Sequence, residues 1–462
     1  MSDLLIDSAA GATFALHLLA EPALEGFLAA QSATVARQAE LAGFKAKPGQ
    51  VLVAAAGEGG EDIALFGLGA AATADSTLFR ALPAKLPPGD YRLAPTADAV
   101  SFEAVALGWA LGGYAFSRYR KPRKEPWPRL VVGDVDLSEV RAIARGCALA
   151  RDLVNTPAND MGPVELEMAA REIAELHGAT ISVIVGDDLL PAGYPAVHAV
   201  GRAADPTRAP RMIEISWGAA DAPRLALVGK GVVFDTGGLD LKPSSGMRLM
   251  KKDMGGAAHV LGLAHMVMAA RLPVRLSVLL PVVENAVSGE AMRPGDVIAS
   301  RKGLSIEIGN TDAEGRLILA DALTRAAELN PDLTLDLATL TGAARAALGP
   351  QVIPFYTADE ALAAAIASAG AAAADPVWRM PLWSGYDDAL DSDIADLKND
   401  PDGWAQAGSV TAALFLQRFA PPGAWAHFDI FAWNPKSRPG HPVGAEAQTI
   451  RALYAMLKAR YQ

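Results

Sequence analysis

Along the chain, the spacing of apolar residues alternates between two patterns. Short apolar runs bounded by Gly, Pro, Asn or Asp have strand character, whereas longer stretches with apolar residues three and four positions apart have helical character. We predict helices at Pro163–His177, Ala257–Ala270, Gly315–Leu329 and Ala361–Ala374, and strands at Thr180–Val185, Ala196–Gly201, Arg211–Trp217, Arg224–Gly229, Val274–Val283 and Leu333–Leu337. This alternation predicts an α/β domain with a mostly parallel or mixed sheet covered by helices on both faces.

The first part of the chain shows the same alternation on a smaller scale. Val51–Ala54 and Ile63–Phe66 have strand character, and a helical pattern over Ser138–Leu153 precedes the turn-rich stretch Asn155–Pro163. At 462 residues the chain is too long for one ordinary domain. We therefore predict a small N-terminal α/β domain at residues 1–130, a linker helix and junction at 131–160, and a larger C-terminal domain at 161–462.

Composition and charge limit the classes of binding partner and the cellular compartment that we expect for the protein. A net charge of -11 argues against non-specific binding of nucleic acid or of an anionic membrane. The single cysteine, Cys147, excludes an intramolecular disulfide and any multi-cysteine metal site, and it fits a reducing cytosol. The acidic start Met1–Asp7 has no basic segment, and no apolar run reaches the ~18 residues that span a bilayer. We expect a soluble, cytoplasmic protein without a membrane partner.

The octapeptide Asn310–Leu317 carries the first cluster of reactive side chains. It follows a run with strand character, Ser305–Ile308, and precedes a helical pattern, so it lies where α/β proteins usually bind ligands. An extended conformation would place Asp312, Glu314 and Arg316 on one side of the chain. The alternative interpretation is a salt-bridge cluster at the start of the helix.

A second cluster lies upstream, around Gly229–Gly238. Lys230 stands between two glycines within an apolar strand, where a lysine is costly unless it is paired or neutral; a lysine that reaches solvent from the strand end is the alternative. Asp235 ends the apolar run, and the Gly-Gly pair after it allows close backbone approach. Asp253 precedes a helix and could simply cap it, while Lys242 could be a surface lysine before a proline.

Taken together, these positions predict a two-metal centre. Strand ends and helix starts meet at one edge of a parallel sheet. Bridging carboxylates suit a pair of ions such as Zn²⁺, Mn²⁺ or Mg²⁺, and two ions about 3.5–4 Å apart can activate a shared water. Two cationic side chains, Lys242 and Arg316, are then available to stabilise an oxyanion or to hold an anionic helper.

The motifs resemble those of the leucyl aminopeptidase (cytosol aminopeptidase) family of two-metal peptidases. The resemblance runs from about Leu153 to Gly349, and the N-terminal part agrees with the family's macro-like domain in size and α/β character. The matching segments are Gly229–Gly238, Leu241–Pro243, Asp253–Ala257, Ala291–Asp296, Asn310–Leu317 and Leu337–Ala343. The resemblance implies a metallo-exopeptidase that releases N-terminal leucine and other, mainly apolar, residues by attack of a water bridging two divalent metals.

The resemblance also implies a role for each site residue. One metal, Mn²⁺ or Zn²⁺, would be held by Lys230, Asp235, Asp253 and Glu314, and the other by Asp235, Asp312 and Glu314. Lys242 would bind the scissile carbonyl, and Arg316 would hold a bicarbonate ion that acts as general base. The substrate pocket would comprise Met250, Asn310, Thr339, Leu340 and Gly342.

Substrates and assembly follow from the same resemblance. The family requires peptides with a free N-terminus and assembles as homohexamers. The stretch His441–Gln448 departs from the Gly-Ala-Thr-Gly pattern of many members, which leaves the side-chain preference open.

Other functional classes are weighed against this interpretation. No His-x-x-x-His pattern is present, which excludes a zincin, and no Gly-x-Ser-x-Gly elbow marks a serine hydrolase. A two-metal phosphoesterase and a non-catalytic scaffold remain as alternatives. Lys230 as a neutral metal ligand argues against the first, and the complete set of ligand and cationic positions argues against the second.

Overall fold

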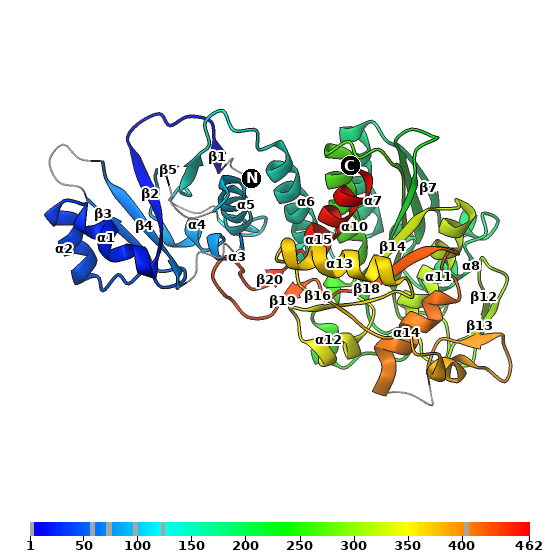
Figure 1. The fold of residues 1–462 in the computed structure, drawn as a ribbon. Helices are drawn as coiled ribbons and strands as arrows, with labels where there is room; N and C mark the ends of the chain where they lie inside the picture. Colours follow the sequence, from blue (N-terminus) through cyan, green and yellow to red (C-terminus); the bar gives the residue numbers. More distant parts are fainter. Residues whose placement is uncertain (1–3, 56–60, 71–75, 96–99, 122–124, 402–405) are drawn as a thin grey trace. The chain divides into compact units, whose positions relative to one another are not determined.

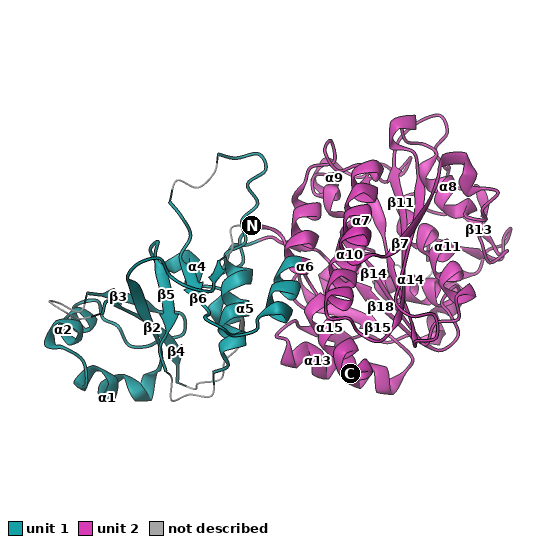
Figure 2. Cartoon of the chain, turned by 90° about the horizontal axis from the view of Figure 1, so that it is seen from above, with its two compact units in different colours: residues 1–145, 436–443 teal, residues 146–435, 444–462 magenta. Residues whose placement is uncertain are grey.

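The chain folds into two compact units (Figures 1 and 2). The computed structural model describes residues 4–55, 61–70, 76–95, 100–121, 125–401 and 406–462. Unit 1 comprises residues 1–145 and 436–443, and unit 2 comprises residues 146–435 and 444–462. The division falls inside helix α6 (Ser138–Asn155), and a short segment near the C-terminus belongs to unit 1. The boundaries expected from the sequence stay a prediction.

Unit 1 is built on a six-stranded sheet. Its strands in spatial order are β1 (Leu5–Ile6), β6 (Arg129–Val131), β5 (Asp90–Leu93), β2 (Thr13–Ala20), β4 (Ile63–Gly69) and β3 (Val51–Ala54). All neighbours are parallel except β3 and β4. Trp109 of α5 (Phe102–Gly112) packs into one apolar cluster, and Val35 and Ala39 of α2 (Ala33–Leu41) into another. Apolar layers of this kind hold a small α/β domain together.

Unit 2 contains a nine-stranded mixed sheet. The path runs through β16 (Val377–Arg379), β15 (Ile353–Tyr356), β18 (Ala424–Asp429), β14 (Leu333–Ala338), β9 (Arg224–Gly229), β11 (Arg275–Asn285), β8 (Arg211–Trp217) and β7 (Thr180–Val185), with β10 (Gly231–Asp235) paired to β11. The central strands β18, β14, β9 and β11 are parallel, whereas β15, β8 and β7 introduce antiparallel pairs. The predicted α/β fold with a mostly parallel or mixed sheet is confirmed.

Helices cover both faces of this sheet (Figure 1). One face carries α7 (Pro163–His177), α10 (Gly255–Ala269), α13 (Glu360–Ala372) and α15 (Ile450–Tyr461), and the other carries α8 (Pro195–Gly201), α11 (Glu314–Glu328) and α14 (Gly408–Gln417). Helix α10 is apolar around its whole circumference because it is enclosed between the sheet, α7 and α15. None of the helices in the described ranges is both long enough and apolar enough to cross a membrane.

One predicted strand is wrong. Residues Ala196–Gly201 belong to helix α8. A short apolar run does not distinguish a strand from a buried helix. Two features favour the helix: Pro195 occupies its first turn, and the Asp321 carboxylate accepts hydrogen bonds from the backbone N–H groups of Ala196 and Val197 at 2.8 and 3.2 Å.

Candidate active site

The site lies at the carboxyl edge of the central strands of unit 2. Asp235 is the last residue of β10, Asp429 is the last residue of β18, and Thr339 directly follows β14. Asp253 lies two residues before α10, and Glu314 is the first residue of α11. A cavity of about 500 Å³ opens at this edge, lined by all of these residues except the buried Glu314. Parallel strands and helix starts converge at such an edge, which is where α/β folds bind ligands.

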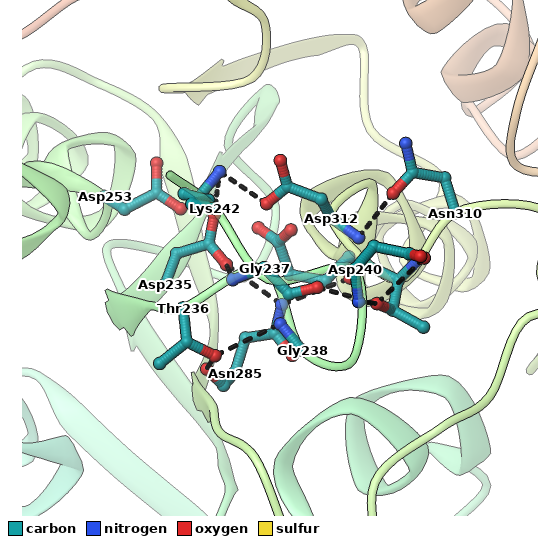
Figure 3. Close-up of polar contacts among 12 residues, drawn as sticks. Asp235, Thr236, Gly237, Gly238, Asp240, Lys242, Asp253, Asn285, Asn310 and Asp312 are labelled. Carbon is teal, nitrogen blue, oxygen red and sulfur yellow. Dashed lines mark hydrogen bonds and ion pairs between the residues drawn. The ribbon is translucent and has the colours of Figure 1, made fainter. Parts of the chain in front are cut away.

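Three carboxylates form the centre of the site. One oxygen from each of Asp235, Asp312 and Glu314 lies within 4.8 Å of the other two. Asp235 is fixed in place, since its Oδ1 accepts hydrogen bonds from the Gly237 N–H and from Asn285 Nδ2, both at 2.9 Å (Figure 3). Like charges this close repel each other, so the cluster requires cations.

Lys230 supplies one of these cations. Its Nζ lies 2.7 Å from Asp253 Oδ2 and 2.9 Å from Glu314 Oε1, and it donates a hydrogen bond to the Thr339 carbonyl at 3.0 Å. Burial by itself lowers the pKa of Lys230, but the neighbouring carboxylates outweigh it and raise the pKa above its usual value. The buried lysine is therefore paired and does not reach solvent from the strand end.

Lys242 supplies a second cation from the cavity wall. Its Nζ lies 2.8 Å from Asp235 Oδ2 and also contacts Asp312 Oδ1 (Figure 3). Burial lowers the pKa of Lys242, and the carboxylates of Asp235 and Asp312 raise it by more. Lys242 is thus a positive charge aimed at the centre of the cluster, and the surface-lysine interpretation is wrong.

The raised pKa values of two carboxyl groups indicate that this cluster needs further positive charge. Burial, assisted by the charge of Asp235, raises the pKa of Glu314 to about 8 and that of Asp312 to about 6. Asp253 Oδ2 and Glu314 Oε1 touch the Lys230 ammonium but have no partner in hydrogen-bond geometry. Closely spaced carboxylate oxygens with spare lone pairs are the donors that hard or borderline divalent ions prefer, so these residues fit a metal centre.

The octapeptide reaches this centre through a turn, and it does not adopt the extended conformation that would have placed its charged residues on one side. Asp312 N–H bonds Asn310 Oδ1 at 2.8 Å, which curls the chain before α11 begins at Glu314. Thr311 fastens the turn, because its hydroxyl donates to the Gly237 carbonyl at 2.6 Å. Asp312 and Glu314 therefore converge through a turn that leads into a helix, and not through strand alternation.

In the described part of the chain, Arg316 is not paired with either acid of the octapeptide. Its Nη1 donates to the Asn399 carbonyl at 2.7 Å, while its buried Nε lacks a hydrogen-bond partner. Within the described part of the chain Arg316 forms no ion pair, so a salt-bridge cluster does not account for the octapeptide. Burial lowers the pKa of Arg316 to about 10, and the group remains a cation at neutral pH.

The acidic stretch Asp387–Gly403 contributes a residue that the sequence analysis missed. The density of acidic residues in this stretch indicates a solvated loop, and residues 402 and 403 lie outside the described ranges. Leu397–Lys398 instead forms strand β17 beside β13 (Ser305–Glu307), which buries Asn399. Asn399 Oδ1 accepts the Gly309 N–H at 2.9 Å, and Nδ2 donates to the Asn310 carbonyl at 2.8 Å. The apolar Leu397 before Asn399 is the only signal that could have indicated this strand.

Four of the five residues expected in the substrate pocket line the cavity, and one does not. Met250, Thr339, Leu340 and Gly342 line the cavity. Asn310 is not among the lining residues, since its side chain serves the octapeptide turn.

Asp429 is a further residue that sequence reasoning missed. Its Oδ1 accepts the Leu340 N–H at 2.9 Å, and its Oδ2 accepts the Thr341 hydroxyl at 2.7 Å. Asp429 thereby holds the loop that lines the cavity. A polar residue at the end of the apolar run Ala424–Phe428 was the available signal.

Profiles of known families match both parts of the chain. Residues 148–454 match the profile described as "Cytosol aminopeptidase family, catalytic domain", and residues 14–132 match "M17 aminopeptidase, N-terminal domain". A probable cytosol aminopeptidase of Roseiflexus castenholzii is 41% identical over 373 residues, which cover 77% of this chain and 76% of that protein. Another, from Syntrophotalea carbinolica, is 42% identical over 374 residues, covering 77% of this chain and 74% of that protein.

Solved structures resemble the whole chain. The crystal structure of a cytosol aminopeptidase from Coxiella burnetii matches with a TM-score of 0.94 and 42% identity, covering 99% of this chain and 100% of that one. The bottromycin maturation enzyme BotP, solved in complex with Mn, matches with a TM-score of 0.87 and 34% identity, covering 98% and 100% of the two chains.

Proposed function

Because the chain belongs to the cytosol aminopeptidase family of metal-dependent, leucyl aminopeptidase-type hydrolases, we propose that it uses two divalent ions to remove N-terminal residues from peptides. The observation that carries the proposal is the convergence of Asp235, Asp312 and Glu314 within 4.8 Å of one another, with a lysine on either side. Membership in a peptidase family removes the support for a phosphoesterase or a non-catalytic scaffold.

We assign the carboxylates and Lys230 to the metals. Asp235 and Glu314 would bridge two ions, and Asp312 would complete one site. Asp253 would complete the other together with Lys230, whose ammonium would have to lose a proton to offer a lone pair. The contacts of Lys230 with Asp253 and Glu314 support this grouping. When bound, the ions would activate a shared water and polarise the scissile carbonyl. We propose Mn²⁺ or Zn²⁺, and the Mn in the complex of the related BotP favours testing Mn²⁺ first.

Lys242 is assigned to the carbonyl oxygen of the scissile bond. It lies in the cavity wall and directs a charged ammonium group at Asp235 and Asp312. A fixed cation at this place would stabilise the negative charge that develops on the oxygen during attack. The group costs little to reorganise, because the carboxylates already hold it in position.

Arg316 is assigned to a bicarbonate ion that accepts the proton of the attacking water. The support is its buried guanidinium, whose Nε has no hydrogen-bond partner and could bind an oxyanion. The Asn399 carbonyl fixes the other side of the guanidinium through Nη1.

Leucine and other mainly apolar residues are the proposed substrates, in peptides with a free N-terminus. The lining residues Met250, Leu340 and Ile353 support apolar contact with the first side chain. We also propose cytoplasmic peptide turnover by a homohexamer, on the grounds of family membership. Sedimentation velocity would test the assembly, and a monomer at all concentrations would contradict it.

The decisive experiment is hydrolysis of leucine p-nitroanilide after chelation and after return of Mn²⁺ or Zn²⁺. N-acetylated leucine p-nitroanilide is the matched control, because only its amine is blocked. Activity that returns with metal and is absent on the blocked substrate supports the proposal. Absence of both activity and bound metal would refute it, whereas two bound ions without activity would indicate a narrower substrate range.

A further inference from the structure

A lysine that has no part in the proposed chemistry lies in the wall of the same cavity. The side chain of Lys252, between Met250 and the metal-site residue Asp253, is only 9% exposed and lines the cavity. Its Nζ lies 3.8 Å from Asp253 Oδ1, beyond hydrogen-bond distance, and 5.5 Å from the centre of the Phe431 ring. Among the described residues, no side chain or carbonyl accepts a hydrogen bond from Lys252.

A second cation contacts the same ring. The guanidinium carbon of Arg345, in α12 (Gly342–Leu348), lies 4.7 Å from the centre of the Phe431 ring. Arg345 lines the cavity and forms no ion pair with any residue in the described ranges. It lies one helical turn after Gly342, so the two residues share a face of α12. Lys252, Phe431 and Arg345 therefore form a cationic wall beside the expected pocket for the first side chain.

The acids around this wall are already engaged. Asp253 contacts Lys230, and Asp429 accepts hydrogen bonds from the Leu340–Thr341 loop. A buried ammonium without a close acceptor is costly, and a carboxylate brought by a ligand would relieve that cost. The cavity therefore has a complementary place for one anionic group on the substrate.

We propose that Lys252, assisted by Arg345, lets the pocket accept an acidic first side chain, so that the enzyme releases N-terminal Glu or Asp as well as apolar residues. This inference rests on the proposed aminopeptidase function. Lys252 and Arg345 act here as specificity-determining residues, and their stems and the Phe431 ring still offer apolar surface to a leucine side chain.

The anionic group could also be the C-terminal carboxylate of a dipeptide. Amino-acid p-nitroanilides separate the two sources, because they have no C-terminal carboxylate. The proposal is that the side chain supplies the charge, so the preference must appear in substrates that lack any other carboxylate.

The test compares kcat/KM for the p-nitroanilides of Glu, Gln and Leu with the metal-loaded enzyme. Glu and Gln have nearly the same shape, so their ratio isolates the side-chain charge. We expect Glu to exceed Gln by about tenfold or more, as a charged hydrogen bond allows. In Lys252→Met, which keeps an unbranched side chain of similar length, the Glu/Gln ratio should fall to about one or below.

Lys251→Met is the matched control. It removes the same charge one position earlier, from a lysine that bonds the Asn155 carbonyl and does not line the cavity. Its Glu/Gln ratio should equal that of the parent enzyme. Arg345→Met, at an exposed position, provides a second variant should Lys252→Met fail to fold, and its ratio should fall several-fold.

The outcomes distinguish the acidic-residue inference from the aminopeptidase proposal on which it rests. Hydrolysis of the Leu substrate with a Glu/Gln ratio of one or below would overturn the acidic-residue inference and leave the aminopeptidase proposal intact. A Glu preference that survives in Lys252→Met would overturn the role of Lys252. A carboxylate preference seen only with dipeptides would assign the wall to the C-terminal group instead. Failure on all three substrates by a protein that also binds no metal would overturn the proposed function itself.

Discussion

The two site lysines differ in what they touch, and that difference separates their roles. Lys230 is enclosed by Asp253, Glu314 and the Thr339 carbonyl, whereas Lys242 faces the cavity. Replacement of Lys230, which lies among the proposed metal ligands, would therefore affect metal binding. Replacement of Lys242, which faces the cavity, would affect the stabilisation of the reacting carbonyl.

Replacement of Lys242 and of Glu314 should therefore have different effects on metal content. Lys242→Ala should lower kcat by about a hundredfold or more, as for other fixed oxyanion donors, and retain both ions. Glu314→Ala should lose metal, because a bridging carboxylate serves both sites. Metal analysis of the purified variants beside leucine p-nitroanilide kinetics checks this. Metal loss in Lys242→Ala would contradict its assigned role.

The raised carboxylate pKa values predict pH-dependent metal binding. The pKa of Glu314 is about 8 and that of Asp312 about 6, so these acids hold their protons to higher pH than usual. Metal binds the deprotonated carboxylates, and protons therefore compete with it at the low end of this range. We expect the apparent Mn²⁺ affinity to rise between about pH 6 and about pH 8, with proton release. Calorimetry in buffers of different ionisation enthalpy measures both the Mn²⁺ affinity and the number of protons released. An affinity that does not change with pH would refute the expectation.

At the scale of elements, α10 approaches the sheet through glycine. A Cβ on Gly256 would lie 2.1 Å from the Leu337 carbonyl oxygen and 2.7 Å from the Lys230 nitrogen, both backbone atoms. The start of α10 is thus close enough to β14 and β9 for Asp253 to reach Lys230.

Gly256→Ala should force α10 away from the sheet. We expect a loss of about 2 kcal/mol or more in the free energy of unfolding, as for other overpacked sites, together with weaker metal binding. Gly289→Ala is the control, since nothing lies within 4 Å of its added Cβ. Denaturant unfolding of both variants tests this, and equal stability would show that the backbone shifts at little cost.

The loop after β14 depends on Asp429 at the end of β18. Asp429→Asn keeps the shape but loses the charge that accepts from Leu340, Thr341 and the Thr341 hydroxyl. We expect kcat/KM to fall about tenfold or more because the pocket wall is misplaced, with both metals retained. An effect on metal content with unchanged kinetics per loaded site would assign Asp429 a structural role at the metals instead.

At the scale of the molecule, the metal site connects segments far apart in the chain. Asp235 ends β10, Asp253 precedes α10, and Asp312 and Glu314 lead into α11. Cations bound to all of these carboxylates would hold the segments together only in the folded state.

Metal should therefore raise thermal stability. Free ion at about a hundred times its Kd stabilises a folded protein by about 2.7 kcal/mol, which is a rise of several degrees in Tm. Thermal scans after chelation and after addition of Mn²⁺ test this, with Glu314→Ala as the variant that should not respond. An unchanged Tm in the parent protein would contradict the metal assignment.

The α/β class, most of the alternating elements of unit 2 and the reactive residue types could all be predicted before the structure was known, because periodicity and motifs depend only on residues that are neighbours along the chain. The helix at Ala196–Gly201 was missed because its cap comes from Asp321, a residue of α11, and Pro195 by itself did not distinguish the helix from a strand. The sequence also could not place Asn399 under the octapeptide.

The contacts between distant side chains became known only from the three-dimensional fold. It joined Lys252 and Arg345 across Phe431 and brought Asp429 to the Leu340 loop, although these residues are far apart in sequence. It also showed that the octapeptide forms a turn into α11 and is not extended. The physical reason is that local patterns specify elements, whereas contacts between strand ends and helix starts depend on how the sheet orders its strands.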